Sequence, residues 1–410
     1  MIKNQKQSAW IGIAVAISLG VFVYFTLRWL FAPVNKPQNG PAVPQQAEQQ
    51  LRENGDPDAS GSLPEFFSEI RAKRIDGEWQ LGYKPDAAGT AAFLATLAKP
   101  NLAQAGPDLL AKSQDQKPIL LYRALHEAYA ATHNGREWRV GQQKIGDCVS
   151  WGWAHGADIH LAVMWKLGQS AEWQEAATES IYGGSRVESR GATRGGYSDG
   201  SYGGAAARWV KDWGIVFRRD YSEQKIDLTT YSGERAKSWG NFGNGGENDE
   251  GKFDAVAKKH PVRSVAVVRD FREAAAAIQA GYPVPVCSGQ GFTSSRDKDG
   301  FAAARGSWAH CMCFIGVRFD RPGLLCLNSW GPSWVSGDKW PADQPDGSFW
   351  VDEATATRML RGGDSFAVSG YEGFPYRDLA NGDWVVTEPH EVKQFAGRIR
   401  NREQFVLAPR

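Results

Sequence analysis

One cysteine stands at the start of a predicted helix, where a thiol becomes reactive. Gly146-Asp147-Cys148 directly precedes an apolar-periodic run that predicts a helix from Cys148 to Leu167. The positive end of a helix dipole and its free backbone N–H groups favour the thiolate, which is the nucleophilic form. The other four cysteines lie in strand-like apolar runs: Cys287, Cys311, Cys313 and Cys326. Burial there raises the pKa of a thiol, so Cys148 is the candidate nucleophile.

A thiol nucleophile needs a base within hydrogen-bond reach, and His310 is the histidine best placed to supply it. His155 and His160 follow Cys148 on the same predicted helix, roughly 10 and 18 Å away along its axis. His310 instead opens a predicted strand that runs to Phe319, and so can project at a domain edge. We therefore take His310 as the candidate general base.

The next predicted strand supplies a residue that can orient this base. The predicted strand over 324–327 is followed directly by Asn328, and Trp330 lies two residues later. If the two strands form a hairpin, Asn328 lies beside His310, and its amide can fix the tautomer of the ring. Trp330 would cover the pair and exclude water, which strengthens the interaction. The sequence thus predicts a triad of Cys148, His310 and Asn328.

A metal site is an alternative interpretation of the same strand. His310, Cys311 and Cys313 have the ligand chemistry that zinc uses, and Cys287 and Cys326 lie on other predicted strands. Residues two apart on a strand share a face, but they lack the two-residue gap of a zinc knuckle. The sequence therefore predicts no metal and no cofactor.

Composition and charge are those of an ordinary globular protein. Of the 410 residues, 42% are hydrophobic and 23% are charged, which is enough for a real core in one large domain or two modest ones. The formal net charge is +1, so no global field directs the chain to nucleic acid, and no such partner is predicted. The five cysteines show no spacing typical of a disulfide framework.

An uncharged, mostly apolar run near the N-terminus predicts a membrane anchor. No charged residue occurs from Ser8 to Leu27, and a helix of that length spans about 30 Å, the thickness of a bilayer core. A cleaved signal peptide is the alternative, but its apolar core is about 7–15 residues long and a small-residue cleavage site follows it. We therefore predict a single-pass transmembrane helix over 8–31, with the lipid bilayer as a partner.

The rest of the chain divides by composition. Residues 32–60 are rich in Pro, Gln, Asn and Gly and predict a disordered linker, while 61–135 form an extension with a helix predicted from Pro118 to Thr132. The main domain, 136–370, is predicted to be helical to about residue 215 and to form strands thereafter, with a polar insertion over 219–260. Residues 371–410 form a tail. The fold class expected is α+β.

The order of these features resembles the papain family of cysteine peptidases. The likeness covers roughly residues 138–370, and three segments carry it: Gln142 to Cys148, Asp199 to Gly203, and Asn328 to Gly331. It implies a two-lobed fold, with a helical lobe facing a β-barrel-like lobe. It also implies that a protein or peptide substrate is hydrolysed through a thioester acyl-enzyme. Family members more often act outside the cytoplasm, so we expect the catalytic domain on the extracytoplasmic side of the membrane.

The resemblance also assigns roles to individual residues. It implies that Gln142 and the Cys148 backbone N–H stabilise the oxyanion, at about 3 kcal/mol per donor. The residues that contact the substrate would be Tyr202, Gly203, Cys311 and Trp330.

The chain departs from the family pattern at several positions. Ile145 and Ser198 stand where the family has a disulfide pair, and Val149 replaces the tryptophan after the nucleophile. Asp147 replaces a small residue, and a negative charge beside Cys148 should oppose the thiolate.

Two other functions fit the same residues. A non-catalytic papain-like fold would serve as a structural or binding module at a membrane or particle surface. A related thiol enzyme would transfer the acyl group to an amine instead of to water. A pro-segment within 61–135 is a further possibility that no sequence pattern demands.

Overall fold

The computed structural model describes residues 81–113, 118–190, 199–247, 252–379 and 384, all within a unit that spans Leu63–Arg410. The predicted membrane span over 8–31 and the linker over 32–60 lie outside them. No helix in the described part of the chain is both long and apolar enough to cross a bilayer. The described residues form α-helices and antiparallel strands, so the predicted α+β class is confirmed.

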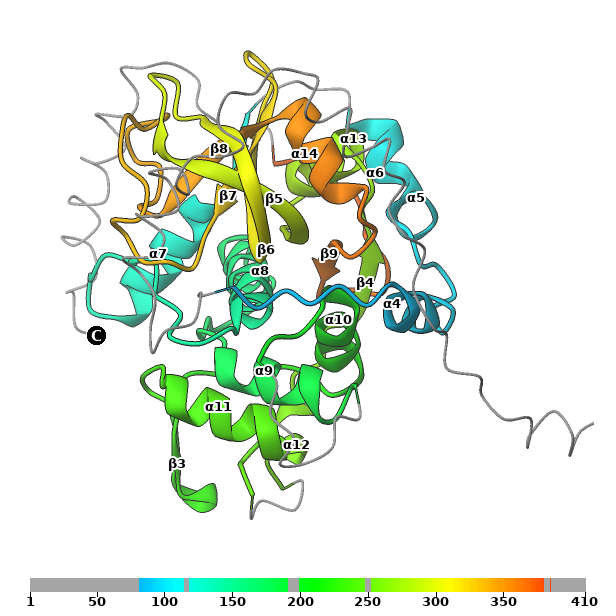
Figure 1. Ribbon diagram of the computed structural model, residues 1–410, viewed down its shortest axis with the longest axis vertical. Coiled ribbons are helices and arrows are strands. Elements are labelled where there is room, and N and C mark those ends of the chain that lie inside the picture. Colours follow the sequence, from blue (N-terminus) through cyan, green and yellow to red (C-terminus); the bar gives the residue numbers. More distant parts are fainter. Residues whose placement is uncertain (1–80, 114–117, 191–198, 248–251, 380–383, 385–410) are drawn as a thin grey trace, which may run out of the picture. The chain divides into compact units, whose positions relative to one another are not determined.

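The largest sheet is built around one long strand, β6 (Figure 1). Its members are β1 (Ile119–Leu120), β5 (Val284–Arg296), β6 (Ala302–Arg318), β7 (Gly323–Leu327) and β8 (Ser348–Asp352). Strand β6 pairs with β5, with β7 and, near its end, with β1, and every pair is antiparallel. The predicted hairpin of the His310 strand with the following strand is therefore confirmed.

The start of the His310 strand was predicted wrongly. Strand β6 begins at Ala302, eight residues before His310, and His310 lies inside the strand opposite Ser288 of β5. The five residues over 303–307 are exposed, small or polar, and they pair with β5 across irregular register shifts. These solvent-exposed residues of the hairpin include no β-branched side chain, so their composition does not predict a strand.

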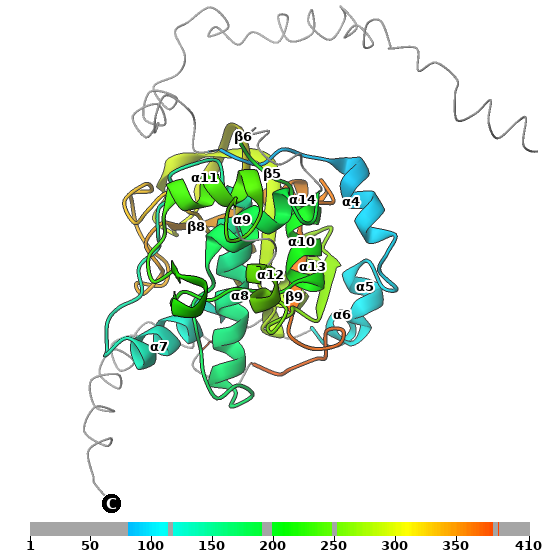
Figure 2. The same cartoon turned by 90° about the horizontal axis from the view of Figure 1, so that it is seen from below.

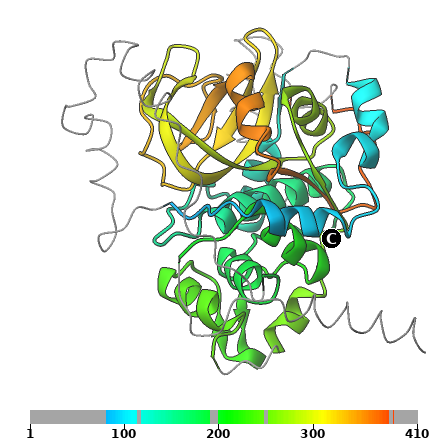
Figure 3. The ribbon, with the colours of Figure 1, turned by 45° about the vertical axis from the view of Figure 1, so that its right-hand side comes forward.

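Helix α8 (Cys148–Lys166) matches its predicted bounds within one residue. It lies between the sheet and a group of helices, as Figures 1 and 3 show. Those helices are α9 (Thr178–Arg186), α10 (Gly203–Asp212), α11 (Gly233–Phe242) and α12 (Lys252–Ala257). The helix ends where Gly168 adopts a φ of +70°, a conformation that favours glycine and closes helix C-termini.

Two other predicted segments differ from the structure. The predicted helix from Pro118 begins only at Tyr122, as α7 (Tyr122–Thr132), because the preceding residues pair with β6 instead. The predicted polar insertion over 219–260 contains α11 and α12, whose Trp239 and Phe253 are buried against each other. In both cases long-range packing outweighs local composition.

The remaining elements surround these two layers, with α4, α5 and α6 following one another along one flank (Figure 2). The helices are α4 (Ala87–Leu94), α5 (Leu102–Ala105), α6 (Pro107–Lys112), α13 (Phe271–Gln279), α14 (Glu353–Leu360) and the short 3-10 helix η1 (Ser222–Gln224). The strands are β2 (Asp220–Tyr221), β3 (Ile226–Asp227), β4 (Ser264–Val267) and β9 (Phe366–Ser369). Strand β4 pairs with β9, and β2 pairs with β3.

Two glycines let α8 approach the sheet closely. A Cβ atom on Gly152 would lie 2.8 Å from the carbonyl oxygen of Met312 and 2.9 Å from the Cys311 sulfur. One turn later, a Cβ on Gly156 would lie 2.8 Å from the Pro285 ring. This contact brings the first turn of α8, which starts at Cys148, against the part of β6 that carries His310.

We expect Gly152→Ala to destabilise the protein by about 1–3 kcal/mol, because the added methyl overpacks the contact between α8 and β6. Alanine favours a helix over glycine by about 1 kcal/mol, so a purely local effect would have the opposite sign. Urea unfolding of the full chain measures the difference. Gly289→Ala is the matched control, since the only neighbour of its new Cβ is the Ser307 hydroxyl at 3.8 Å. Equal stability of the two variants would contradict the close approach.

Candidate active site

His310 and Asn328 form a buried hydrogen-bonded pair. The His310 Nε2 atom lies 2.7 Å from Asn328 Oδ1, and both residues are at most 1% exposed. The Ser329 backbone N–H donates to the same Oδ1 atom at 2.7 Å, which identifies that atom as the oxygen. Nε2 must therefore be the protonated nitrogen, and the lone pair of the neutral ring is on Nδ1. The ring is thus held in the tautomer that a base requires.

Tryptophans enclose this pair. The Trp330 ring centroid lies 4.6 Å from that of His310, and Trp308 packs against Trp330 at 4.8 Å. Burial lowers the pKa of His310 to about 4, although the bond to Asn328 acts in the opposite direction. The prediction that Trp330 covers the pair is confirmed, and the imidazole is neutral at physiological pH.

Cys148 lies at the first position of α8 and reaches the strand that carries the base. Its thiol faces the backbone N–H of Cys311, the residue after His310, and the backbone N–H of Gly82. Cys148 is 0% exposed. Among the described residues His310 Nδ1 has no hydrogen-bond partner, so no hydrogen bond joins it to the Cys148 thiol.

A short extended segment of the chain, residues Leu81–Lys84, crosses the site, and we call it the strap. The Tyr83 backbone N–H donates to the Ala309 carbonyl at 3.2 Å, and the Lys84 N–H donates to the Ser201 carbonyl at 2.8 Å. The Ser201 N–H donates in turn to the Gly82 carbonyl at 2.8 Å, which makes a parallel bridge. In Figures 1 and 3 the strap, in blue, passes between the sheet and helix α10.

The strap lies directly on the loop that leads to Cys148. A Cβ atom on Gly82 would lie 1.8 Å from the Gly146 carbonyl oxygen, so only glycine fits there. With the strap in place, burial raises the pKa of the Cys148 thiol well above its usual range. The prediction that Cys148 is activated by its helix position is therefore wrong for this conformation, because desolvation outweighs the two N–H groups that favour the thiolate.

Asp147, which the sequence predicts to be a negative charge that opposes the Cys148 thiolate, is buried and hydrogen-bonded in the structure. Its carboxyl is buried, and burial raises its pKa well above the usual range, although the bond from the Tyr231 hydroxyl at 2.9 Å opposes this shift. The nearby carboxyls of Asp199 and Glu179 raise the pKa further. Burial therefore disfavours the charged form of Asp147, while the carboxyl still acts to raise the pKa of the Cys148 thiol.

The loop before Cys148 is tied to the loop after Asn328. The buried Gln143 side chain accepts a bond from the Ser329 hydroxyl at 2.6 Å, and the Gln143 N–H donates to the Ser329 carbonyl at 2.8 Å. Gln142 is exposed, and a Cβ on Gly331 would lie 3.4 Å from its Oε1 atom. Its role as an oxyanion donor stays a prediction, whereas Gln143 is a positioning residue that the sequence did not reveal.

Three of the residues predicted to contact the substrate lie near the strap: Tyr202, Gly203 and Cys311. Tyr83 is buried in one apolar cluster with Tyr202, Cys287 and Cys311. The Gly203 N–H donates to the carboxyl of Asp364 at 2.7 Å, and that carboxyl acts to raise the pKa of Tyr83. The fourth predicted contact, Trp330, lies instead against His310.

The strap, Ala309, Ser201 and Asp364 were not found by sequence reasoning. Ser201 lies within the Asp199–Gly203 stretch, and Ala309 precedes the candidate base, so position offered a signal for both. Tyr83 and Asp364 offered none, because neither stands in a motif or a periodic pattern.

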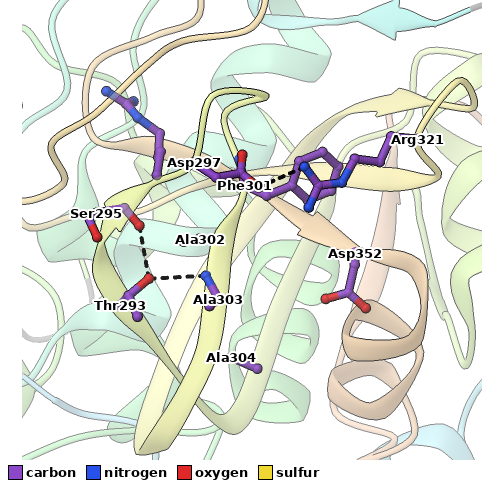
Figure 4. A pocket seen from close by; sticks show the side chains of 10 residues that line it. Thr293, Ser295, Asp297, Phe301, Ala302, Ala303, Ala304, Arg321 and Asp352 are labelled. Carbon is purple, nitrogen blue, oxygen red and sulfur yellow. Dashed lines mark hydrogen bonds and ion pairs between the residues drawn. The ribbon is translucent and has the colours of Figure 1, made fainter.

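A separate open pocket of about 500 Å³ lies at the far end of the β5–β6 hairpin (Figure 4). On its rim Arg321 pairs with Asp297 at 2.7 Å and stacks on Phe301. The residues that line it include no cysteine or histidine, so it supplies neither a nucleophile nor a base. Across the described residues, no three His, Cys, Asp or Glu side chains converge as a metal site, and all five cysteines are free thiols.

Comparison with known proteins finds distant structural likeness and nothing closer. No family model and no curated protein matches the chain. Among solved structures, a cysteine protease from Xylella fastidiosa, xylellain, is 16% identical with a TM-score of 0.46, over 71% of this chain and 96% of that one. Procathepsin B S9 from Trypanosoma congolense is 11% identical with a TM-score of 0.42, over 82% and 99%. Procathepsin L 3 from Tenebrio molitor is 13% identical with a TM-score of 0.40, over 81% and 94%.

We expect Asp147→Asn to change the rate of Cys148 alkylation at pH 7 by no more than about threefold, because burial raises the pKa of the carboxyl that it replaces and so disfavours its charged form. If that carboxyl were charged, its loss would lower the pKa of the thiol and increase the thiolate population, by about tenfold if the pKa fell by one. Mass spectrometry after timed exposure to iodoacetamide measures the rate. An increase of about tenfold or more would show that Asp147 carries a charge.

Proposed function

We propose that this chain is a papain-like cysteine peptidase. The observation that carries the proposal is the strap, an extended stretch of polypeptide held by backbone hydrogen bonds to Ala309 and Ser201. Such bonds recognise any peptide main chain, whatever its side chains. They hold the peptide over Cys148, whose thiol faces the backbone of Cys311, the residue after a histidine with an unprotonated Nδ1 atom. A site that binds extended peptide over a thiol and a base has the parts that peptide-bond cleavage requires.

The proposed chemistry begins when the strap leaves and the Cys148 thiol turns toward His310 Nδ1. The sulfur attacks the peptide carbonyl as its proton passes to Nδ1, and the imidazolium then returns that proton to the leaving amine. Water then hydrolyses the thioester, with the same nitrogen as base. Asn328 keeps the orientation and tautomer of the His310 ring fixed throughout. We assign the oxyanion contacts to the Cys148 backbone N–H and Gln142.

The strap gives this proposal a regulatory consequence. Because Cys148 and His310 are at most 1% exposed beneath it, a substrate cannot reach them until it is displaced. The conformation described is therefore a closed form of the enzyme. Displacement also returns the thiol to solvent, which removes the desolvation that raises its pKa.

We expect Cys148→Ala to abolish peptide cleavage and His310→Ala to reduce kcat by at least about a thousandfold, because each removes a group that forms or breaks bonds. Cleavage of a fluorogenic peptide library by the full chain measures both. Cys326→Ala is the control, since this buried cysteine of β7 lies outside the site. Cleavage that survives in Cys148→Ala would overturn the proposal, and binding of peptides without any cleavage by the wild type would favour a non-catalytic binding module.

We expect Gly82→Ala to increase both peptide cleavage and Cys148 alkylation by about tenfold or more, because the new Cβ cannot fit against Gly146 and weakens the strap. Gly106→Ala is the control: it introduces a close but less severe contact, at 2.9 Å from the Phe374 Cβ atom, elsewhere in the extension. Tyr83→Ala removes the side-chain anchor of the strap without adding an atom and should act in the same direction. Rates unchanged by both strap variants would show that the strap does not limit access.

A further inference from the structure

The Asp199 side chain joins the loop before the nucleophile to the backbone segment that holds the strap. Its Oδ2 atom accepts a bond at 2.7 Å from the N–H of Gly146, which lies two residues before Cys148. Asp199 itself lies two residues before Ser201, whose N–H and carbonyl bond to the strap backbone. One carboxyl therefore connects the start of α8 to the peptide-binding edge at Ser201. We call the bond from Gly146 to Asp199 the Asp199 link.

Gly146 fits closely against this carboxyl. A Cβ atom on Gly146 would lie 2.6 Å from Asp199 Oδ2, and also 2.6 Å from the Leu81 carbonyl oxygen of the strap. Gly146 is buried, and a buried backbone N–H without an acceptor costs about as much free energy as a lost hydrogen bond. The link therefore satisfies this N–H and fixes the point from which α8 begins.

Tyr182 of helix α9 fixes the orientation of the Asp199 carboxyl. The Tyr182 hydroxyl donates to Asp199 Oδ1, and the Gly200 N–H donates to the same atom at 3.0 Å. These bonds keep Oδ2 directed at Gly146. Tyr182 is fully buried, and a close-packed interior leaves a side chain of this size little freedom to move. The position of Gly146 is thus set from α9 through a single carboxyl group.

The peptide-binding edge is anchored to α9 separately from the link. Arg186 donates to the Gly200 carbonyl, and the Ser201 hydroxyl donates to Ser185 at 2.8 Å. Ser185, Arg186 and Ser201 are all buried. Removal of the Asp199 carboxyl would therefore release the loop before the nucleophile but leave the Ser201 backbone in place.

We infer that Asp199 is a positioning residue, which sets the place of the Cys148 sulfur relative to a peptide held on Ser201. This inference rests on the proposed peptidase activity. Attack on a carbonyl requires the reacting atoms to lie about 3–3.5 Å apart, and a misplacement of about 1 Å can reduce the rate about a hundredfold. The link controls the sulfur side of that distance alone, because the bonds that hold the peptide do not pass through it.

We expect Asp199→Ala to lower kcat by about tenfold or more and to change KM by no more than about threefold, because the thiol loses its position while the peptide-binding edge stays. Asp199→Asn should restore most of kcat. Its amide oxygen can accept from the Gly146 N–H while its amide nitrogen donates to the Tyr182 oxygen. Steady-state cleavage of a fluorogenic peptide by the full chain measures both variants.

Asp158→Ala is the matched control. Asp158 also lies on α8 and accepts a backbone N–H from a distant segment, that of Ala176 at 2.6 Å. It is ten residues beyond Cys148, about 15 Å away along the helix axis. A kcat of Asp199→Ala equal to that of Asp158→Ala, or a loss expressed only in KM, would overturn the inference.

Alkylation of Cys148 provides a second readout that requires no hydrolysis. The measured quantity is the alkylation rate with a peptidyl chloromethyl ketone divided by the rate with iodoacetamide. Both reagents need the strap displaced and the thiolate formed, so these factors cancel, and the ratio reports how well a bound peptide is aligned with the sulfur. The ratio should fall about tenfold or more in Asp199→Ala. Tyr182→Phe removes only the hydroxyl that orients the carboxyl and should lower the ratio in the same direction, which keeps the test decisive if Asp199→Ala does not fold.

The two readouts separate this inference from the proposed function. If the wild type cleaves peptides and Asp199→Ala retains both its kcat and its alkylation ratio, the positioning role alone is overturned. If the wild type shows a high ratio that Asp199→Ala lowers, but no cleavage, the peptidase proposal is overturned and the positioning role stands. A wild type that neither cleaves peptides nor distinguishes the two reagents would overturn both.

Discussion

The hydrogen bond from the His310 ring to the Asn328 side-chain oxygen determines what this site can do. It joins two neighbouring strands at 2.7 Å, and it fixes the proton on Nε2 and the lone pair on Nδ1. Because Trp330 covers the pair, water cannot compete for the bond, and the ring stays neutral. The close approach of α8 at Gly152 and Gly156 then brings Cys148 beside the same strand. Without these two constraints the thiol would be one more buried cysteine.

The strap accounts for the buried state of the Cys148 thiol. The strap buries the thiol, and this burial raises the pKa of Cys148. The strap backbone also bonds to the backbone groups of Ala309 and Ser201, which a bound substrate would need. On the proposed function, substrate binding and inhibition would use the same backbone hydrogen bonds.

The sequence revealed those parts of the site that local pattern encodes. Cys148 precedes a long apolar-periodic run, and Asn328 follows a strand next to that of His310, so the helix start and the hairpin pair were predictable. The strap was not, because Tyr83 meets Ala309 and Ser201 across more than a hundred residues and has no periodicity of its own. The raised pKa of Asp147 also escaped prediction, since it depends on burial by distant elements. The membrane span predicted over 8–31 lies outside the described residues and stays a prediction.

The central claim is that the Cys148 sulfur attacks a peptide carbonyl, and a covalent intermediate tests it most directly. The full chain carrying Gly82→Ala is mixed with an activated peptide ester, quenched in acid within one turnover, digested and analysed by mass spectrometry. The account predicts a thioester adduct, of the mass of the acyl portion, on the fragment that contains Cys148. Turnover of the ester with no adduct on Cys148, or with the adduct on another cysteine, would contradict it.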